Sequence, residues 1–388
     1  MKIAYYCQQV LGVGHFHRSL QICRALSRHH QVTMITGGAP LQVSEEKIDY
    51  FQLPGLIMDH NFHNLTPCDA QLSLDQTKAL RAKALMNFFA SYRPQIFLVE
   101  LYPFGRKAFR FELDPLLTAI KVGSLHRCLV LCSLRDILVE RHDRKKFEAR
   151  VIATLNHSFD GLLIHGDKSL IPLETTFDRV DDIAVPLAYT GYVTPQPAAG
   201  ARDKIRRELG LGKKRRLIIA SIGGGNVGLE LLHVTIKACA LLADESLTLM
   251  VFAGPYASSR QLLRLREKAD ARTSVERFSP RFSDMLAAAD LSISMAGYNT
   301  TMNVLAAGTP ALLYPFSQNQ EQRLRLKALE GKVPLSALEE ADLTPAALAR
   351  RIQNAYMQQR FTSPIALDGA VTTAALVQNW HHNGKVKK

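Results

Sequence analysis

The sequence predicts an α/β protein of two doubly wound domains, each built on a parallel sheet with helices around it. The first observation is the order of its patterns, because apolar runs such as Lys2–Tyr6 and Gln31–Thr36 flank an amphipathic stretch at His15–Ser27. The second is Pro195–Gly200, which holds two prolines and small residues without apolar periodicity and is typical of a linker. The third is the length of 388 residues, which suits two domains with full cores.

These signals set the expected domain boundaries. We expect an N-terminal domain at residues 1–193, a linker at 194–202, a second domain at 203–375, and a helix end with a basic tail at 376–388. Composition agrees with this division, since 47% hydrophobic and 21% charged residues are ordinary for globular domains.

The chain is basic, with 48 Lys and Arg against 35 Asp and Glu, a formal net charge of +13. The excess is visible at Arg141–Lys146, Lys213–Arg216 and Lys385–Lys388. Such runs are usually solvated faces, and the alternatives are contact with an anionic membrane surface or an anionic substrate. Nucleic acid is not an expected partner, because no basic motif interleaved with aromatic residues is found.

The six cysteines form no C-x-x-C pair and no metal-ligand spacing, which argues against a disulfide scaffold and a structural zinc site. The first residues lack the apolar core of a signal peptide, and no stretch approaches the roughly 18 apolar residues of a spanning helix. We therefore expect a cytoplasmic protein whose membrane contact, if any, is peripheral and at the inner face.

A glycine-rich loop follows the first strand. Gly12 and Gly14 lack the third glycine of a dinucleotide fingerprint, and no acidic residue ends the second strand, so that motif is rejected. What remains is His15 at the start of a helix, with Arg18 one turn later. A neutral imidazole there is a candidate general base, and the alternative is a helix-start histidine that faces solvent.

Two further strands of this half end in charged residues. Ile96–Glu100 is followed by a loop that reaches Arg106, and Leu129–Ser133 is followed by Arg135. Doubly wound folds place active-site groups at the carboxyl ends of their strands. Glu100 is therefore a second candidate base, and the alternative is a surface carboxylate paired with Arg106.

In the second half, the strand Arg216–Ser221 leads into Gly223, Gly224, Gly225 and Asn226. Successive glycines allow positive φ angles and a close approach to the backbone, which suits a phosphate or a sugar. A tight structural turn is the alternative.

The most informative segment is Asp290–Gln322. An apolar strand, Leu291–Met295, meets Gly297, and a helix then runs from Asn299 to Ala307. A second strand and a polar loop rich in amide side chains follow. The free N–H groups and the dipole at the start of this helix favour a phosphate.

The order of these parts resembles the MurG-like, family 28 type of nucleotide-sugar glycosyltransferases of the GT-B fold. The residues that carry the resemblance are Phe282, Asp284, Met285, Ala289, Asp290, Ser294, Gly297, Thr300, Ala306, Ala307, Gly308, Pro310, Pro315 and Gln322. The resemblance implies two Rossmann-like domains that face each other across a cleft. It also implies that the last helix crosses back to the first domain, with Trp380 between the domains.

The resemblance further implies a donor site in the second domain. Phe278 would contact the base of the nucleotide, and Asn303 stands where the group usually has a glutamate for the ribose hydroxyls. The donor-binding residues expected in this way are Gly223, Gly224, Gly225, Asn226, Phe278, Gly297, Tyr298, Asn299, Thr300, Asn303, Gln320 and Gln322. The acceptor side would hold Gly12, Gly14, Arg18, Arg106 and Arg135, beside the catalytic candidates His15 and Glu100.

The expected activity is an inverting glycosyl transfer from a nucleotide-diphosphate-sugar, such as a UDP-sugar, to an unidentified acceptor, lipid-linked or an anionic glycan. No D-x-D motif is placed to hold a metal, so no metal and no cofactor are expected. The string from Gly14 to Arg18 also resembles the PseG-type nucleotide-sugar hydrolases. A hydrolase, a 2-epimerase and a non-catalytic nucleotide-sugar-binding protein are therefore the alternatives.

Overall fold

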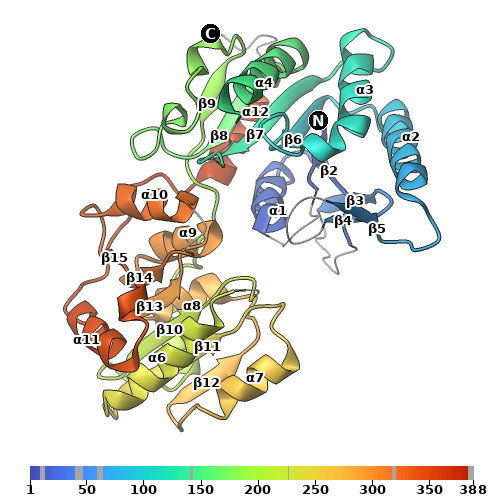
Figure 1. Cartoon of the computed structure of the whole chain (residues 1–388). Coiled ribbons are helices and arrows are strands. Elements are labelled where there is room, and N and C mark those ends of the chain that lie inside the picture. The colour runs from blue at the N-terminus through green and yellow to red at the C-terminus, as the bar shows by residue number, and fades with distance from the viewer. Residues whose placement is uncertain are drawn as a thin grey trace. The chain divides into compact units, whose positions relative to one another are not determined.

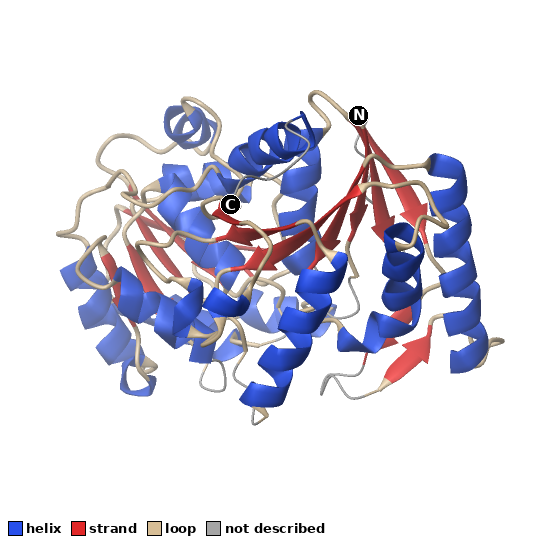
Figure 2. Cartoon of the chain, turned by 90° about the horizontal axis from the view of Figure 1, so that it is seen from above, coloured by secondary structure: helices blue, strands red, loops and turns tan. Residues whose placement is uncertain are grey.

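The computed structural model describes residues 1–8, 14–39, 47–58, 64–139, 143–225, 227–316 and 320–382. The chain divides into two compact units (Figure 1). Unit 1 comprises Met1–Val193 together with Asp368–Lys388, and unit 2 comprises Thr194–Leu367. Each unit contains a parallel sheet with helices beside it (Figure 2), so the expected two-domain α/β fold is confirmed.

Unit 1 is built on a seven-stranded parallel sheet of order β3-β2-β1-β6-β7-β8-β9. These strands are β1 (Lys2–Tyr6), β2 (Gln31–Thr36), β3 (Ile48–Gln52), β6 (Ile96–Glu100), β7 (Leu129–Arg135), β8 (Gly161–His165) and β9 (Leu187–Tyr189). Its helices are α1 (Gly14–Leu26), α2 (Leu74–Tyr92), α3 (Arg110–Lys121), α4 (Arg144–Ser158) and α12 (Gly369–His382). A small antiparallel pair, β4 (Leu56–Met58) and β5 (Leu65–Pro67), lies outside the sheet.

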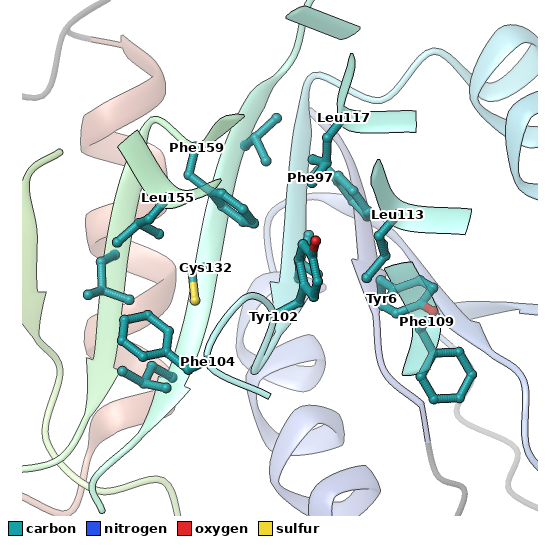
Figure 3. Close-up of a cluster of buried hydrophobic side chains, with 14 of the residues drawn as sticks. Tyr6, Phe97, Tyr102, Phe104, Phe109, Leu113, Leu117, Cys132, Leu155 and Phe159 are labelled. Atoms are coloured by element: carbon teal, nitrogen blue, oxygen red, sulfur yellow. The ribbon is translucent and has the colours of Figure 1, made fainter. Parts of the chain in front are cut away.

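One face of this sheet carries an aromatic core. The ring of Phe97 on β6 packs edge-on against Phe89 of α2, with 4.7 Å between the ring centroids. It also packs edge-on against Tyr6 of β1, and Figure 3 shows these two side chains. Leu113 of α3 covers the same face and is fully buried. Alternate residues of β6 therefore anchor the sheet to α2 and α3, which fixes the strand that ends at Glu100.

A fully buried ion pair also joins α2 to α3. Arg81 donates two hydrogen bonds to the carboxylate of Glu112, at 2.8 and 2.7 Å, and neither side chain is exposed. The same guanidinium donates to the backbone oxygen atoms of Gly37 and Pro54 and to the side chain of Gln8. One cation thus ties the loops after β1, β2 and β3 to the two helices.

The last helix, α12, belongs to unit 1, although residues 369–375 were expected in the second domain. Val377 is buried in the same cluster as Ile3 and Tyr5 of β1. The ring of Trp380 covers Gly161 so closely that a Cβ atom there would lie 2.6 Å from it. The return of the last helix to the first domain agrees with the resemblance, but the boundary at 375 was placed too late. Trp380 packs on Gly161 within unit 1, although it was expected between the domains.

Unit 2 has a six-stranded parallel sheet of order β12-β11-β10-β13-β14-β15. These strands are β10 (Arg216–Ser221), β11 (Leu247–Phe252), β12 (Thr273–Glu276), β13 (Leu291–Met295), β14 (Ala311–Tyr314) and β15 (Leu335–Ala337). Its helices are α5 (Ala201–Glu208), α6 (Leu229–Leu241), α7 (Ser259–Arg266), α8 (Phe282–Ala288), α9 (Tyr298–Ala307), α10 (Gln320–Leu329) and α11 (Pro345–Ala355). Residues 201 and 202, expected in the linker, thus open α5, which packs on α8.

Asp290 holds the beginning of β13 in place. Its carboxylate accepts hydrogen bonds from Arg202 and Arg206 of α5 and from the backbone N–H of Leu217. The motif residue Asp290 is therefore structural. It aligns β13 with β10, the two strands whose following loops carry the predicted donor site.

Across the described ranges, we find no helix with the length and apolar character needed to span a membrane.

Candidate active site

A histidine and a glutamate meet at the carboxyl edge of the sheet in unit 1. Glu100 is the last residue of β6, and His15 lies in the first turn of α1, which follows the neighbouring strand β1. The Nδ1 atom of His15 lies 2.6 Å from Oε1 of Glu100. The structure thus joins the two candidate bases into one pair. The carboxylate orients the imidazole, and Nε2 is left as the atom that can take a proton.

Two arginines complete this cluster. Arg18 donates a 2.6 Å hydrogen bond to Oε1 of Glu100, and Arg106 lies 3.4 Å from Oε2. The carboxylate of Glu100 is fully buried, whereas the side chain of His15 is 23% exposed. The alternative interpretation of Glu100 was a surface carboxylate paired with Arg106. The pairing with Arg106 is present, but Glu100 is buried and does not lie on the surface. His15 is neither fully buried nor turned away into solvent.

The charges of the cluster fix its protonation at neutral pH. Burial alone would raise the pKa of Glu100, but His15, Arg106 and Arg18 together hold it well below its usual range. Burial lowers the pKa of His15 to about 4, with Glu100 opposing this shift and the two arginines adding to it. His15 is therefore neutral and Glu100 ionised at pH 7, the states that a general base and its orienting carboxylate require.

The loop between Glu100 and Arg106 has an unusual backbone. Leu101 and Arg106 both adopt positive φ angles, of 65° and 57°. Side chains other than glycine rarely adopt this conformation, and it is often found where a fold holds a functional group in place. Here it turns the chain back so that the guanidinium of Arg106 faces the carboxylate of Glu100.

A buried hydrogen-bonded chain lies beside the pair and was missed by the sequence analysis. His165, at the end of β8, contacts Ser133 at 2.7 Å and Thr190 at 2.9 Å, and Ser133 contacts the hydroxyl of Tyr5 at 2.8 Å. The Thr190 hydroxyl donates to a backbone oxygen of Gly191, so it accepts from Nδ1–H of His165. Nε2 of His165 therefore accepts from Ser133. Burial, with a contribution from Arg18, lowers the pKa of His165 to about 3, and the imidazole is neutral.

The other acceptor-side residues differ in their placement. Gly14 is the exposed first residue of α1, and Arg135 is a half-buried residue at the end of β7. Gly12 lies outside the described residues. Their expected contact with an acceptor remains a prediction.

In unit 2 the glycine-rich loop after β10 packs tightly. Gly223 and Gly225 have positive φ angles, of 66° and 95°. A Cβ atom on Gly225 would lie 2.6 Å from the backbone oxygen of Ala253, so no larger residue fits there. Gly224 has an ordinary backbone and only the ring of Tyr256 near it. Gly225 therefore meets a structural need of the loop. Asn226 lies outside the described residues.

The start of α9 is more open. Gly297 is the N-cap with φ −63°, and a Cβ atom on it would meet nothing within 4 Å. Thr300, in the first turn of α9, is close to the glycine-rich loop, because its Oγ1 would lie 3.7 Å from a Cβ atom on Gly223. The two loops predicted to hold the donor are thus adjacent, and no described residue comes within 4 Å of a Cβ atom on Gly297.

The remaining donor-side residues occupy different positions. The side-chain oxygen of Asn303 accepts a 2.7 Å hydrogen bond from the hydroxyl of Thr194. Gln322 accepts one from the backbone N–H of Phe316, at 2.8 Å, and thereby holds the loop before α10. Phe278 is exposed in the loop after β12. Their expected contacts with a donor stay predictions.

Three further donor-side residues lie at helix N-termini. Tyr298 and Asn299 begin α9 and are half-buried, and the guanidinium of Arg325 lies 5.2 Å from the ring centroid of Tyr298. Gln320 is the exposed first residue of α10.

No cluster of three or more His, Cys, Asp or Glu side chains suited to a metal ion occurs in the part of the chain that the structure describes.

Comparison with known proteins identifies the second unit. Residues 219–369 match the glycosyltransferase family 28 C-terminal domain. Two relatives carry the same name, UDP-N-acetylglucosamine--N-acetylmuramyl-(pentapeptide) pyrophosphoryl-undecaprenol N-acetylglucosamine transferase. The protein of Proteus mirabilis is 29% identical over 149 residues, covering 37% of this chain and 40% of its own length. That of Clavibacter michiganensis subsp. michiganensis is 30% identical over 203 residues, covering 47% and 50%.

Residues 219–369 thus resemble the C-terminal domain of family 28 glycosyltransferases, and the chain is similar to MurG-like proteins. This confirms the resemblance stated from the sequence. The chain spans only about half the length of these MurG-like relatives or less, so their whole activity does not pass to it directly.

Solved structures extend the likeness to the whole fold. MurG of Acinetobacter baumannii superimposes with a TM-score of 0.56 at 15% identity, covering 98% of each chain. Os79 of O. sativa in complex with UDP has a TM-score of 0.61 at 14% identity, covering 97% of this chain and all of its own. The MurG-like chain therefore has the GT-B fold, as expected.

Proposed function

We propose that this protein is a metal-independent, inverting glycosyltransferase that moves a sugar from a nucleotide-diphosphate-sugar to an acceptor hydroxyl. The observation that carries the proposal is the 2.6 Å contact between His15 and the buried carboxylate of Glu100. It is supported by the family 28 C-terminal domain and by the transferase names of the MurG-like relatives.

In the proposed reaction, Nε2 of His15 takes the proton of the acceptor hydroxyl while the hydroxyl oxygen attacks the anomeric carbon. The bond from that carbon to the diphosphate oxygen breaks, and the nucleoside diphosphate leaves with the bonding electrons. Glu100 stabilises the imidazolium that forms, since its carboxylate lies against Nδ1. A single displacement from the opposite face inverts the anomeric configuration.

Unit 2 would hold the donor. The open space at Gly297 and the backbone N–H groups at the start of α9 suit a diphosphate, and the glycine-rich loop lies beside them. These groups would stabilise the charge of the leaving diphosphate, so the proposal needs neither a metal nor a cofactor. The Os79 complex with UDP supports a uridine nucleotide as the first donor to test.

For the acceptor we propose a lipid-linked or otherwise anionic molecule. The cluster at Glu100 places two arginine side chains beside His15, and arginines favour an anionic group on the acceptor. The formal net charge of +13 would favour an anionic membrane surface, and the relatives' printed name includes a pyrophosphoryl-undecaprenol group. The protein would then act at the inner face of the membrane.

The test begins with calorimetric titration of UDP, GDP, CDP and dTDP and of their sugar conjugates. We expect saturable binding of one nucleoside diphosphate, and release of that nucleotide from its sugar only when an acceptor is present. Binding by none of them would contradict the proposal. Binding without release in the presence of broad acceptor pools would favour a non-catalytic nucleotide-sugar-binding protein.

A nucleotide-sugar hydrolase is the second candidate. Its support is the partial exposure of His15, whose side chain is 23% accessible to solvent and could take a proton from water as readily as from an acceptor. In that case, free nucleotide would appear at the same rate without any acceptor. A 2-epimerase of the same fold would instead interconvert two sugar conjugates of one nucleotide.

A further inference from the structure

Tyr256 is a half-exposed aromatic side chain that follows strand β11. Its ring lies over the glycine-rich loop, because a Cβ atom on Gly224 would be 3.6 Å from its Cδ2. Its backbone N–H donates a 3.0 Å hydrogen bond to the oxygen of Gly224. The side chain nevertheless remains 46% exposed, so burial does not account for an aromatic residue at this position.

The backbone around Tyr256 is held rigidly by glycines. Gly254 has a φ of 88°, and a Cβ atom on it would lie 2.5 Å from the backbone oxygen of Gly223. A Cβ atom on Gly225 would lie 2.6 Å from the oxygen of Ala253. The two loops thus pack backbone against backbone, which fixes where the ring of Tyr256 projects.

A second exposed aromatic residue, Phe278, is 54% exposed in the next loop. Strands β11 and β12 are neighbours, with Phe252 opposite Glu276, so both loops leave the same edge of the sheet. The side chain of Arg277 donates a hydrogen bond to the backbone oxygen of Ala257. Phe278 follows Arg277 in the sequence, and Tyr256 precedes Ala257, so the hydrogen bond joins the two loops that carry these aromatic residues.

We propose that Tyr256 is a further base-binding residue of the donor site, and that the nucleotide base stacks on its ring in addition to the contact expected at Phe278. The inference rests on the proposed function. A base offers a flat π-face that stacks on aromatic rings. The Tyr256 ring projects from a backbone held by tightly packed glycines, so binding a base there requires little ordering of that loop. The glycine-rich loop connects this ring to the start of α9, because Gly224 lies near Tyr256 and Gly223 lies near Thr300.

The test compares Tyr256→Ala, Tyr256→Leu and Tyr256→Phe with Leu263→Ala, a control on α7 that is 57% exposed. Titration uses the nucleoside diphosphate found for the unaltered protein, and inorganic diphosphate as a competitor. We expect the Ala and Leu variants to bind the nucleotide roughly tenfold more weakly, as loss of base stacking does. The Phe variant and the control should bind it as the unaltered protein does, and the inhibition constant of inorganic diphosphate should not change.

The outcomes separate this inference from the proposed function. Unchanged nucleotide affinity in both the Ala and Leu variants would overturn the role of Tyr256 while leaving the proposed function intact. An equal loss for the nucleotide and for inorganic diphosphate would mean that Tyr256 only supports the glycine-rich loop, which also overturns it. If the unaltered protein binds no nucleotide, the proposed function fails and this inference fails with it.

Discussion

His15 and Glu100 are 85 positions apart in the sequence, yet a 2.6 Å contact joins His15 Nδ1 to the Glu100 carboxylate. Because that contact leaves Nε2 as the proton acceptor, His15→Ala should lower turnover by roughly 10²-fold or more. Donor affinity should be nearly unchanged, since His15 lies in unit 1 and the proposed donor residues lie in unit 2. Steady-state kinetics and calorimetry test the two expectations separately. An unaffected rate would remove His15 from the mechanism.

The pH dependence of the pair follows from its charges. The pKa of His15 is about 4, below its ordinary value of 6.5, so the unfolded chain binds more protons between these limits. The contribution of His15 to stability is therefore complete above about pH 6.5 and declines as the pH falls toward 4. Arg106 disfavours the imidazolium, and Arg106→Met should raise the pKa of His15.

Nuclear magnetic resonance titration of the imidazole tests this shift without any substrate, with His15→Gln used to assign the signal. The acid limb of turnover should move to higher pH in the same variant. A pKa that falls or stays constant in Arg106→Met would show that Arg106 does not lower the pKa of His15.

The buried pair of Arg81 and Glu112 predicts a large effect on stability. Arg81→Met would leave the Glu112 carboxylate buried without its cation, which typically costs about 3–5 kcal/mol. Arg179→Met is the matched control, because Arg179 pairs with Asp182 at 2.6 Å while both side chains are about half exposed. Such a pair contributes about 0–1 kcal/mol. Denaturant unfolding monitored in unit 1 measures both, and equal losses would contradict the role assigned to burial.

Two glycines of unit 2 should respond oppositely to substitution. Gly297→Trp should leave the melting temperature nearly unchanged, since a side chain there begins in open space, yet it should abolish donor binding at the start of α9. Gly254→Ala should lower the melting temperature, because the added Cβ would meet the backbone of Gly223 at 2.5 Å. Retained donor affinity in Gly297→Trp would place the diphosphate elsewhere.

Asn303 supplies a test of the ribose contact. Its side-chain oxygen is already engaged by Thr194, and it carries no charge to attract two hydroxyl groups. Asn303→Glu should therefore tighten binding of a ribonucleotide donor. The second carboxylate oxygen of the glutamate can still accept the hydrogen bond from Thr194. Titration of a ribonucleoside diphosphate against its deoxy form measures this, and unchanged or weaker affinity would count against the assignment.

Segments whose parts are contiguous could be predicted from the sequence. The strand, glycine turn and helix predicted from Leu291 to Ala307 agree with β13 and α9 of the structure. They could be predicted because the apolar run and the glycine that ends it are local signals in the sequence. Helix α2 likewise begins at a local signal, because Ser73 and Gln76 form a capping box at its N-terminus. Strand β3 was missed in a segment of mixed polarity at Ile48–Gln52.

The contacts within the candidate site depend on distances that sequence patterns do not contain. The strand order expected from the sequence put His15 and Glu100 at one edge of the sheet. Their direct pairing and the burial of Arg18 depend on side-chain contacts that a sequence pattern does not contain. The chain through His165 went unnoticed because one histidine at the end of an apolar strand resembles a core residue. In the sequence, Tyr256 is one of many loop residues that follow a strand. Its exposed fraction of 46% could be known only from the structure.

The return of α12 to unit 1 determines how this protein can be divided or recombined. The polypeptide passes between the units twice, at Val193–Thr194 and at Leu367–Asp368. A fragment ending at residue 193 would expose the apolar surface that Val377 and Trp380 cover, so it would be prone to aggregate. Chimeras that exchange the donor unit therefore need two junctions, with the segment 194–367 inserted as a cassette into a host that keeps its own final helix.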